Sequence, residues 1–160
     1  MRTINLNAQI KVYEHREELP AELADLLKQA DDAARNAYCP YSHFQVGAAL
    51  QLANGEVFKG SNQENAAFPS GLCAERTALY YAVANHPNTA IRRLAVVAVN
   101  PANPLTEPIV PCGNCRQSLL EYEHKFGQNI EIIMAAEHGP IYVANSVADL
   151  LPCSFTNDYL

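Results

Sequence analysis

Two short cysteine segments constrain this chain more than any other feature, because a shared role would force them together in space. One is CAER at residues 73–76, and the other is PCGNC at residues 111–115. Cys112 and Cys115 are three residues apart, a spacing at which one loop-to-helix turn can hold a tetrahedral metal ion from one side. Cys73 would supply a third thiolate, so we expect the fold to bring both segments to one point.

The number of thiolates and the carboxylate beside them indicate catalysis. Three protein ligands leave the fourth position of a tetrahedral zinc ion open, which is typical of catalytic rather than structural zinc. Glu75, two residues after Cys73, is then the group that moves protons for whatever occupies that position. The chain has five cysteines, an odd number that fits a disulfide framework poorly. We therefore predict one Zn²⁺ per chain, bound by Cys73, Cys112 and Cys115, with Glu75 as the catalytic residue.

A lone C-x-x-C pair is common in proteins and leaves other interpretations open. It could be a redox pair, or half of a structural zinc site whose remaining ligands come from elsewhere. The candidate fourth ligands of such a closed site are His15, His43, His86, His124, His138, Cys39 and Cys153. A non-catalytic structural zinc module is therefore an alternative from a different functional class, and a fourth protein ligand on the metal would reveal it.

The order of the expected helices and strands predicts an α/β fold. Apolar residues recur at helical spacing in three segments, 20–37, 74–85 and 113–125, and residues 146–151 form a short helix. Strand patterns mark six segments, 4–12, 44–51, 56–61, 94–99, 130–134 and 140–143. The pair Asn54-Gly55 favours a tight hairpin turn between the second and third of these strands. This interleaved order predicts a three-layer α-β-α sandwich, with helices on both faces of one sheet.

Length and charge exclude several classes of protein. The 160 residues most simply form one domain, 1–160, in which residues 1–17 are a strand-like N-terminal extension. The net charge is −6 and no basic run exceeds Arg92-Arg93, so we expect no nucleic acid polymer as partner.

Without a signal peptide or a membrane-length apolar run, we expect a cytoplasmic protein with reduced cysteines. Charged residues, at 18%, are fewer than the roughly 25% of a typical chain, which suggests a surface covered by another subunit.

Both cysteine segments lie where a loop enters an expected helix. Free backbone N–H groups and the positive end of the helix dipole stabilise thiolates at such a place. Zinc with three thiolates still has an excess of negative charge, so a nearby cation would help. We expect Arg76 to donate hydrogen bonds to a ligand sulfur, as partners of metal ligands commonly do.

Five segments of the chain together match one family. They are YCPYSHFQVGAA at 38–49, GSNQENA at 60–66, CAERTA at 73–78, PCGNCRQ at 111–117 and LLPCSF at 150–155. This set resembles the small, homotetrameric, zinc-dependent cytidine deaminases, and it spans most of residues 20–156. A Cys or His ligand, a nearby Glu that does not bind the metal, and a later C-x-x-C are the general layout of zinc nucleobase deaminases. The resemblance implies a mixed sheet of about five strands.

The resemblance also implies a role for each matching residue. Cys73, Cys112 and Cys115 would bind zinc, and Glu75 would be the proton shuttle. The implied substrate contacts come from Phe44 on the base, the backbone N–H of Ala74, Asn62 and Glu64 on the ribose, and Phe155 of a neighbouring subunit. Arg76 and Gln117 would lie around the zinc ligands and support them.

The implied reaction is the hydrolytic deamination of cytidine and 2′-deoxycytidine to the uridines and ammonia, a step of pyrimidine salvage. Zinc-bound hydroxide would attack C4, while Glu75 carries protons to N3 and to the leaving amine. The active oligomer would be a homotetramer with shared active sites, and the partner would be a small pyrimidine nucleoside. Another aminated nucleoside or base remains an alternative substrate. Cys39 and Cys153 have no role in the motifs, so we expect free thiols that are buried or partly buried.

Overall fold

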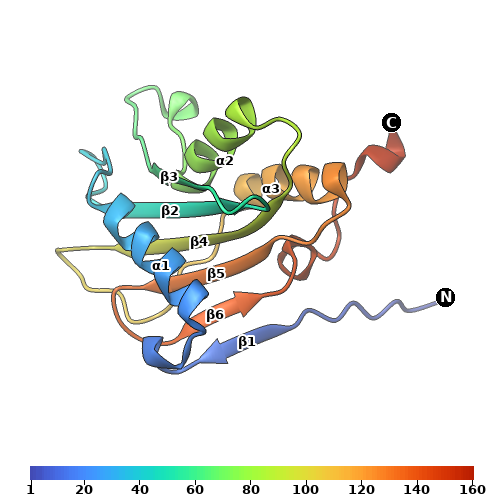
Figure 1. Ribbon diagram of the computed structural model, residues 1–160, viewed down its shortest axis with the longest axis horizontal. Coiled ribbons are helices and arrows are strands. Elements are labelled where there is room, and N and C mark those ends of the chain that lie inside the picture. Colours follow the sequence, from blue (N-terminus) through green and yellow to red (C-terminus); the bar gives the residue numbers. More distant parts are fainter.

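The strand patterns of the sequence become six strands of one sheet in the computed structural model, which describes residues 1–160 (Figure 1). The strands are β1 (Ile10–Tyr13), β2 (Gln45–Leu52), β3 (Val57–Ser61), β4 (Ile91–Val99), β5 (Glu131–Ala136) and β6 (Ile141–Ala144). Their order is β1-β6-β5-β4-β2-β3. β4 and β5 are parallel, and the other neighbouring pairs are antiparallel. The sheet is therefore mixed, as predicted, but it has six strands instead of about five.

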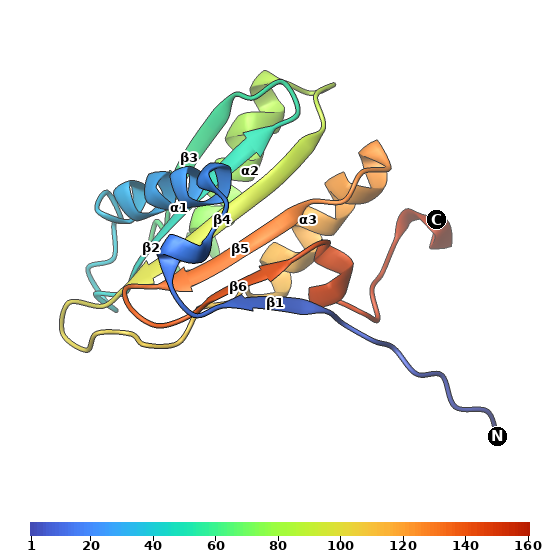
Figure 2. The same cartoon turned by 60° about the horizontal axis from the view of Figure 1, so that its bottom comes forward.

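Helices cover both faces of the sheet, which confirms the three-layer sandwich (Figures 1 and 2). α1 (Ala21–Ala34) lies on one face, while α2 (Ala74–Asn85) and α3 (Gly113–Phe126) lie on the other. Successive residues of a strand point to opposite faces. Along β4, Leu94 therefore packs in the core beneath α2 and α3, and Ala95 packs in the core beneath α1. The apolar run at 94–99 is buried on both sides for this reason, and only Val99 at its end is partly exposed.

Two ends of the chain differ from what the sequence pattern predicts. The strand expected over residues 4–12 is limited to β1, because its only partner, β6, ends at Ala144 opposite Ile10. Residues 1–9 extend away from the sheet, and Ile4 and Leu6 are exposed (Figure 2). The short helix expected at 146–151 is a 3₁₀ turn, Val147–Leu150, capped by the side chain of Ser146.

The ends of the helices in the rest of the chain lie close to those that the sequence predicts. α2 spans the predicted residues. α3 ends at Phe126, and the next residue, Gly127, has a φ of 58°, which a glycine adopts at a helix end without strain. α1 ends three residues earlier than predicted, at Ala34. None of the helices has the length and apolar character needed to cross a membrane.

Candidate metal and active site

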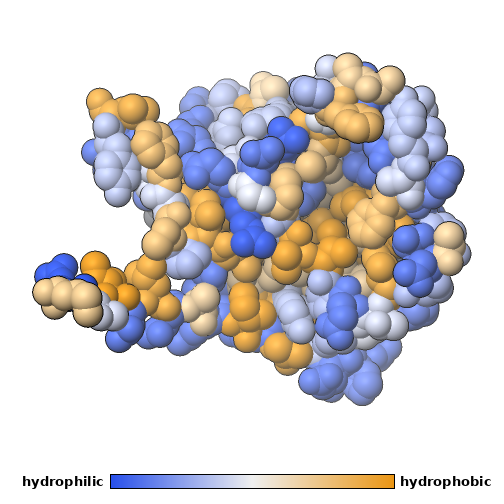
Figure 3. Space-filling model, turned by 180° about the vertical axis from the view of Figure 1, so that it is seen from behind, coloured by the Kyte–Doolittle hydropathy of each residue, from blue (hydrophilic) through white to orange (hydrophobic).

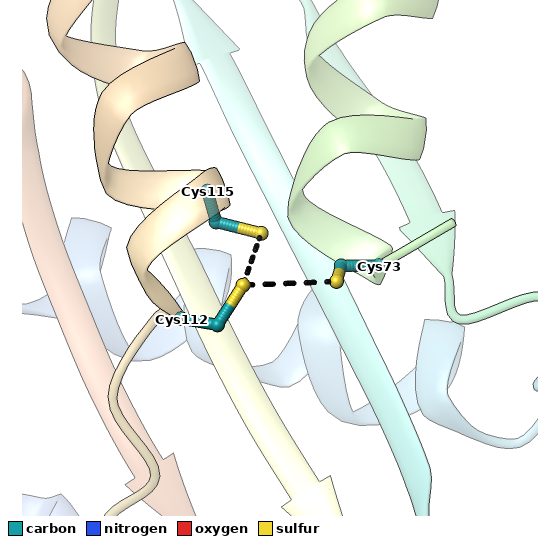
Figure 4. A group of neighbouring side chains, drawn as sticks. All are labelled: Cys73, Cys112 and Cys115. Carbon is teal, nitrogen blue, oxygen red and sulfur yellow. Dashed lines mark hydrogen bonds between the residues drawn. The ribbon is translucent and has the colours of Figure 1, made fainter. Parts of the chain in front are cut away.

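Two helices begin at cysteines and direct their N-termini toward one point. Cys73 immediately precedes α2, and Cys112 immediately precedes α3, both with extended backbone. Cys115 is buried in the first turn of α3. α2 and α3 share one face of the sheet, so their first turns lie next to each other and the three sulfurs turn inward (Figure 4).

The distances between the sulfurs fit a zinc ion. Cys112 Sγ lies 4.0 Å from Cys73 Sγ and 3.5 Å from Cys115 Sγ, and all three atoms lie within 4.8 Å of one another. A tetrahedral zinc ion about 2.3 Å from each thiolate holds its sulfurs about 3.8 Å apart. No fourth Cys, His, Asp or Glu joins the cluster. None of the histidines or other cysteines considered as a fourth ligand is therefore available, which disfavours a closed structural site.

The cluster stabilises a thiolate at Cys73. The neighbouring Cys115 thiol, helped by the Arg76 guanidinium and the Cys112 thiol, lowers the pKa of Cys73 to about 5, although partial burial opposes the shift. The same interaction with Cys73, together with burial, raises the pKa of Cys115. Arg76 Nη2 lies 3.8 Å from Cys73 Sγ, so the guanidinium is the cation closest to this charge.

Glu75 lies in the first turn of α2 and is only 4% exposed. Burial raises the pKa of its carboxyl group, and the nearby negative charge of Cys73 adds to the shift. A raised pKa makes the carboxyl group a stronger base than an exposed carboxylate, which favours a role in general acid–base catalysis. Its oxygens are not part of the sulfur cluster, so the carboxylate is beside the metal position and not within it.

A cavity of about 530 Å³ opens next to the sulfurs and Glu75. Six of its lining residues are candidates from the sequence: Phe44, Asn62, Cys73, Ala74, Glu75 and Cys112. The other four, Val46, Pro108, Ile109 and Val110, were not anticipated. Three of these four belong to the proline-rich loop before Cys112. Ile109 and Val110 directly precede Pro111 and Cys112, and this closeness in the sequence to a predicted ligand is the one indication that they could line the site.

The side chain of Asn62 fixes the backbone around Phe44. Its Oδ1 accepts from the Val46 N–H at 2.8 Å, and its Nδ2 donates to the Phe44 carbonyl at 2.9 Å. A primary amide offers two donors and two lone pairs, so one of each remains for a ligand. His43, with φ of 56°, makes the turn that leads into Phe44, whose N–H donates to Ser42 Oγ at 3.0 Å.

Glu64 lies in a second hollow, of about 540 Å³, which shares Asn62 and Cys73 with the first. Its carboxylate accepts from the backbone N–H groups of Tyr41 and Ser42 at 2.9 and 3.3 Å. Hydrogen bonds from Ser42 and then Tyr41 lower the pKa of this carboxyl group. Asn62 and Glu64 therefore line this hollow together, and Asn62 also reaches the cavity beside the sulfurs.

Besides Cys115, which is buried behind the other two sulfurs, Phe155 and Gln117 line neither hollow. Phe155 is 58% exposed, and its ring stacks on Tyr159 with centroids 5.6 Å apart. Gln117, expected to lie around the zinc ligands, donates from Nε2 to the Phe155 carbonyl at 2.9 Å. Cys39 is partly buried as expected, but Cys153 is exposed because the segment around it makes few contacts.

Comparison with known proteins gives a consistent result. Residues 20–126 match a family model described as "Cytidine and deoxycytidylate deaminase zinc-binding region". The chain is 39% identical to a cytidine deaminase of Halalkalibacterium halodurans, over 82% of this chain and 92% of that protein. It is 35% identical to one of Sporosarcina psychrophila, over 87% and 95% of the two chains. The crystal structure of a cytidine deaminase from Burkholderia pseudomallei is similar, with a TM-score of 0.72 and 37% identity over 86% of this chain and 100% of that one.

Proposed function

Because this chain belongs to the cytidine deaminase family, we propose that it converts cytidine and 2′-deoxycytidine to uridine and 2′-deoxyuridine with release of ammonia. The protein is a zinc-dependent hydrolytic deaminase with one Zn²⁺ as its cofactor. The observation that carries the proposal is the meeting of three thiols and a buried carboxyl group at one cavity. We assign Cys73, Cys112 and Cys115 as the metal ligands.

The chemistry divides between the metal and Glu75. When bound, zinc supplies a Lewis acid that lowers the pKa of water toward neutrality. Glu75 takes a proton from the attacking water and delivers it to N3 of the pyrimidine, which makes C4 electrophilic. It then takes the proton of the new C4 hydroxyl and gives it to the amine, so that the C4–N bond breaks, ammonia leaves and the C4 carbonyl of the uridine forms. The buried position of the carboxyl group suits both transfers, because burial raises its pKa and makes it a stronger base than an exposed carboxylate.

The remaining wall residues bind and orient the nucleoside. The Phe44 ring stacks on the base, and the Ala74 N–H, which has no partner within the first turn of α2, donates to it. The free donor and acceptor of Asn62 bind the sugar, and Glu64 accepts from a ribose hydroxyl in the adjoining hollow. A carboxylate there would repel a phosphate, which favours a free nucleoside over a nucleotide.

The proposal includes a homotetramer in which Phe155 of one subunit completes the site of another. Large apolar side chains are exposed over much of the chain, among them Phe68, Tyr80, Tyr81, Val110 and Phe155. Hydrophobic residues form a broad patch on the face seen from behind (Figure 3). Monomeric proteins rarely leave such a surface open to water. We also place the protein in the reducing cytoplasm, where its five free cysteines would persist.

Ultraviolet absorbance of cytidine incubated with the purified protein tests the activity directly. We expect the absorbance of the cytidine solution to change as uridine forms. This absorbance change should be lost after zinc chelation and should return when zinc is restored. A protein that contains zinc but leaves both cytidine and 2′-deoxycytidine unchanged would overturn the proposal. Deoxycytidylate and aminated bases serve as comparison substrates, and a clear preference for one of these would favour the alternative within the same chemistry.

A further inference from the structure

The C-terminal segment is attached to α3 by polar side chains of that helix. Glu123 is buried and accepts from the Ser146 hydroxyl and, at 2.8 Å, from the Val147 N–H. Arg116 Nη1 donates to the Leu150 carbonyl at 2.8 Å. These contacts fix the chain as far as the end of the 3₁₀ turn at Leu150, five residues before Phe155.

A single hydrogen bond then determines where Phe155 lies. Between residues 152 and 155 the only hydrogen bond is the one from Gln117 Nε2 to the Phe155 carbonyl. The Phe155 ring stacks on Tyr159 and is otherwise largely exposed, so packing against the core does not hold it. Tyr159 belongs to the same C-terminal segment, so the Gln117 amide is the one hydrogen bond that anchors residues 152–155 to the rest of the fold.

Gln117 also points away from the metal ligands. It comes two residues after Cys115 on α3, about 200° around a helix with 3.6 residues per turn. Its side chain is therefore on the opposite side of the helix from the Cys115 sulfur. α3 thus presents the Cys115 sulfur on one side and, on the other, the Gln117 amide that holds the Phe155 carbonyl.

We infer that Gln117 is a positioning residue that aims Phe155 at the active site of a neighbouring subunit. The inference rests on the proposed function, in which Phe155 completes that neighbouring site. Its consequence is specific: loss of the Gln117 amide damages the site of the neighbour and leaves the zinc site of its own chain intact. If Gln117 instead supported the zinc ligands of its own chain, its loss would damage the zinc site of that chain and leave the site of the neighbour intact.

Mixed oligomers distinguish these two effects. Subunits carrying Gln117→Ala have an intact Glu75 but a misplaced Phe155. Subunits carrying Glu75→Gln have a correctly placed Phe155 but lack the catalytic carboxylate. We expect Gln117→Ala alone to keep its zinc and lose about tenfold in kcat/KM, as for the loss of one hydrogen bond of about 1.4 kcal/mol. In a purified mixture of the two tagged subunits, about half of the intact sites would meet an undamaged Phe155. In this mixture, kcat/KM per subunit that carries Glu75 should therefore be severalfold higher than kcat/KM per subunit of the oligomer made only of Gln117→Ala chains.

Two controls make the result decisive. Phe155→Ala mixed with Glu75→Gln should show the same rise, and Glu121→Ala, a matched truncation at an exposed position of α3, should retain wild-type kcat/KM. If the Phe155 mixture recovers and the Gln117 mixture does not, the inference is overturned while the proposed shared site stands. Loss of zinc from Gln117→Ala, or unchanged activity of that variant, also overturns it. If wild-type protein deaminates no cytidine, the proposed function fails and the inference falls with it.

Discussion

The contact between β3 and α2 offers a sharp test of how the fold positions the metal ligands. Gly60 on β3 faces the first turns of α2, where a Cβ atom would lie 2.5 Å from both the Ala74 carbonyl oxygen and the Ala78 nitrogen. Both atoms belong to the helix backbone, which cannot turn aside as a flexible side chain can. Gly60→Ala therefore requires α2 itself to move.

The size of the movement follows from these contacts. Ordinary Cβ contacts begin near 3.4 Å, so the start of α2 must shift by about 1 Å. Overpacking of this kind costs about 1–3 kcal/mol of unfolding free energy. The same shift moves Cys73 and Glu75 relative to Cys112 and Cys115, which remain with α3. A displacement of about 1 Å at a catalytic site can cost about 100-fold in rate.

The measurements are urea unfolding, zinc content and kcat/KM for cytidine, each compared with Gly113→Ala. Gly113 begins α3 directly after Cys112, yet a Cβ there would meet no heavy atom within 4 Å. We expect Gly113→Ala to be neutral or up to about 1 kcal/mol more stable, because alanine favours a helix. A Gly60→Ala protein within about 0.5 kcal/mol of wild type and with unchanged kcat/KM would refute the reasoning.

Four further predictions concern single functional groups and the sugar. Glu75→Gln should keep its zinc but lose about 10²–10⁴-fold in kcat, since a Gln amide carries no proton between water and base; elemental analysis with steady-state kinetics tests this, and near-normal turnover contradicts it. Cys112→Ala should lose both zinc and activity, so full zinc occupancy would exclude Cys112 as a needed ligand. Glu123→Ala should reduce the unfolding free energy by at least ~2 kcal/mol, because the Ile130 and Val147 N–H groups lose their acceptor; a smaller loss in urea unfolding would mean that water replaces the carboxylate. Cytidine and 2′-deoxycytidine should have similar kcat/KM if only the 3′-hydroxyl is bound, and rejection of the deoxy form would show that the 2′-hydroxyl is bound as well.

Sequence patterns were reliable where the interactions are local. The helical period and the cysteine at its start predicted all of α2, because a helix forms its hydrogen bonds within four residues along the chain. The N-terminal strand failed for the opposite reason. The alternation of residues 4–12 is real, but a strand needs a partner, and β6 is too short to pair with anything before Ile10.

The binding residues show the same limit. Asn62 and Glu64 both line one hollow, but only Asn62 also reaches the cavity beside the sulfurs, because the backbone N–H groups of Tyr41 and Ser42 hold the Glu64 carboxylate. Val46 and Ile109 belong to the cavity wall, although they are far apart in the sequence and neither carries a chemical signal. Their place depends on how β2 and the proline-rich loop meet.

The sequence by itself determined the chemistry of this protein: three thiolates, one carboxylate and one cation, each at the start of a helix. Residue type and short spacing are enough for that, because they decide which donors a single turn can present. Only the tertiary structure decided that α2 and α3 share a face of the sheet, which brings the Cys73 and Cys112 sulfurs to 4.0 Å. It also decided that Gln117 points away from those sulfurs toward Phe155. The direction of a helical side chain depends on how its helix is rotated about its own axis when it packs on the sheet. That rotation is determined by contacts between segments that are distant in the sequence.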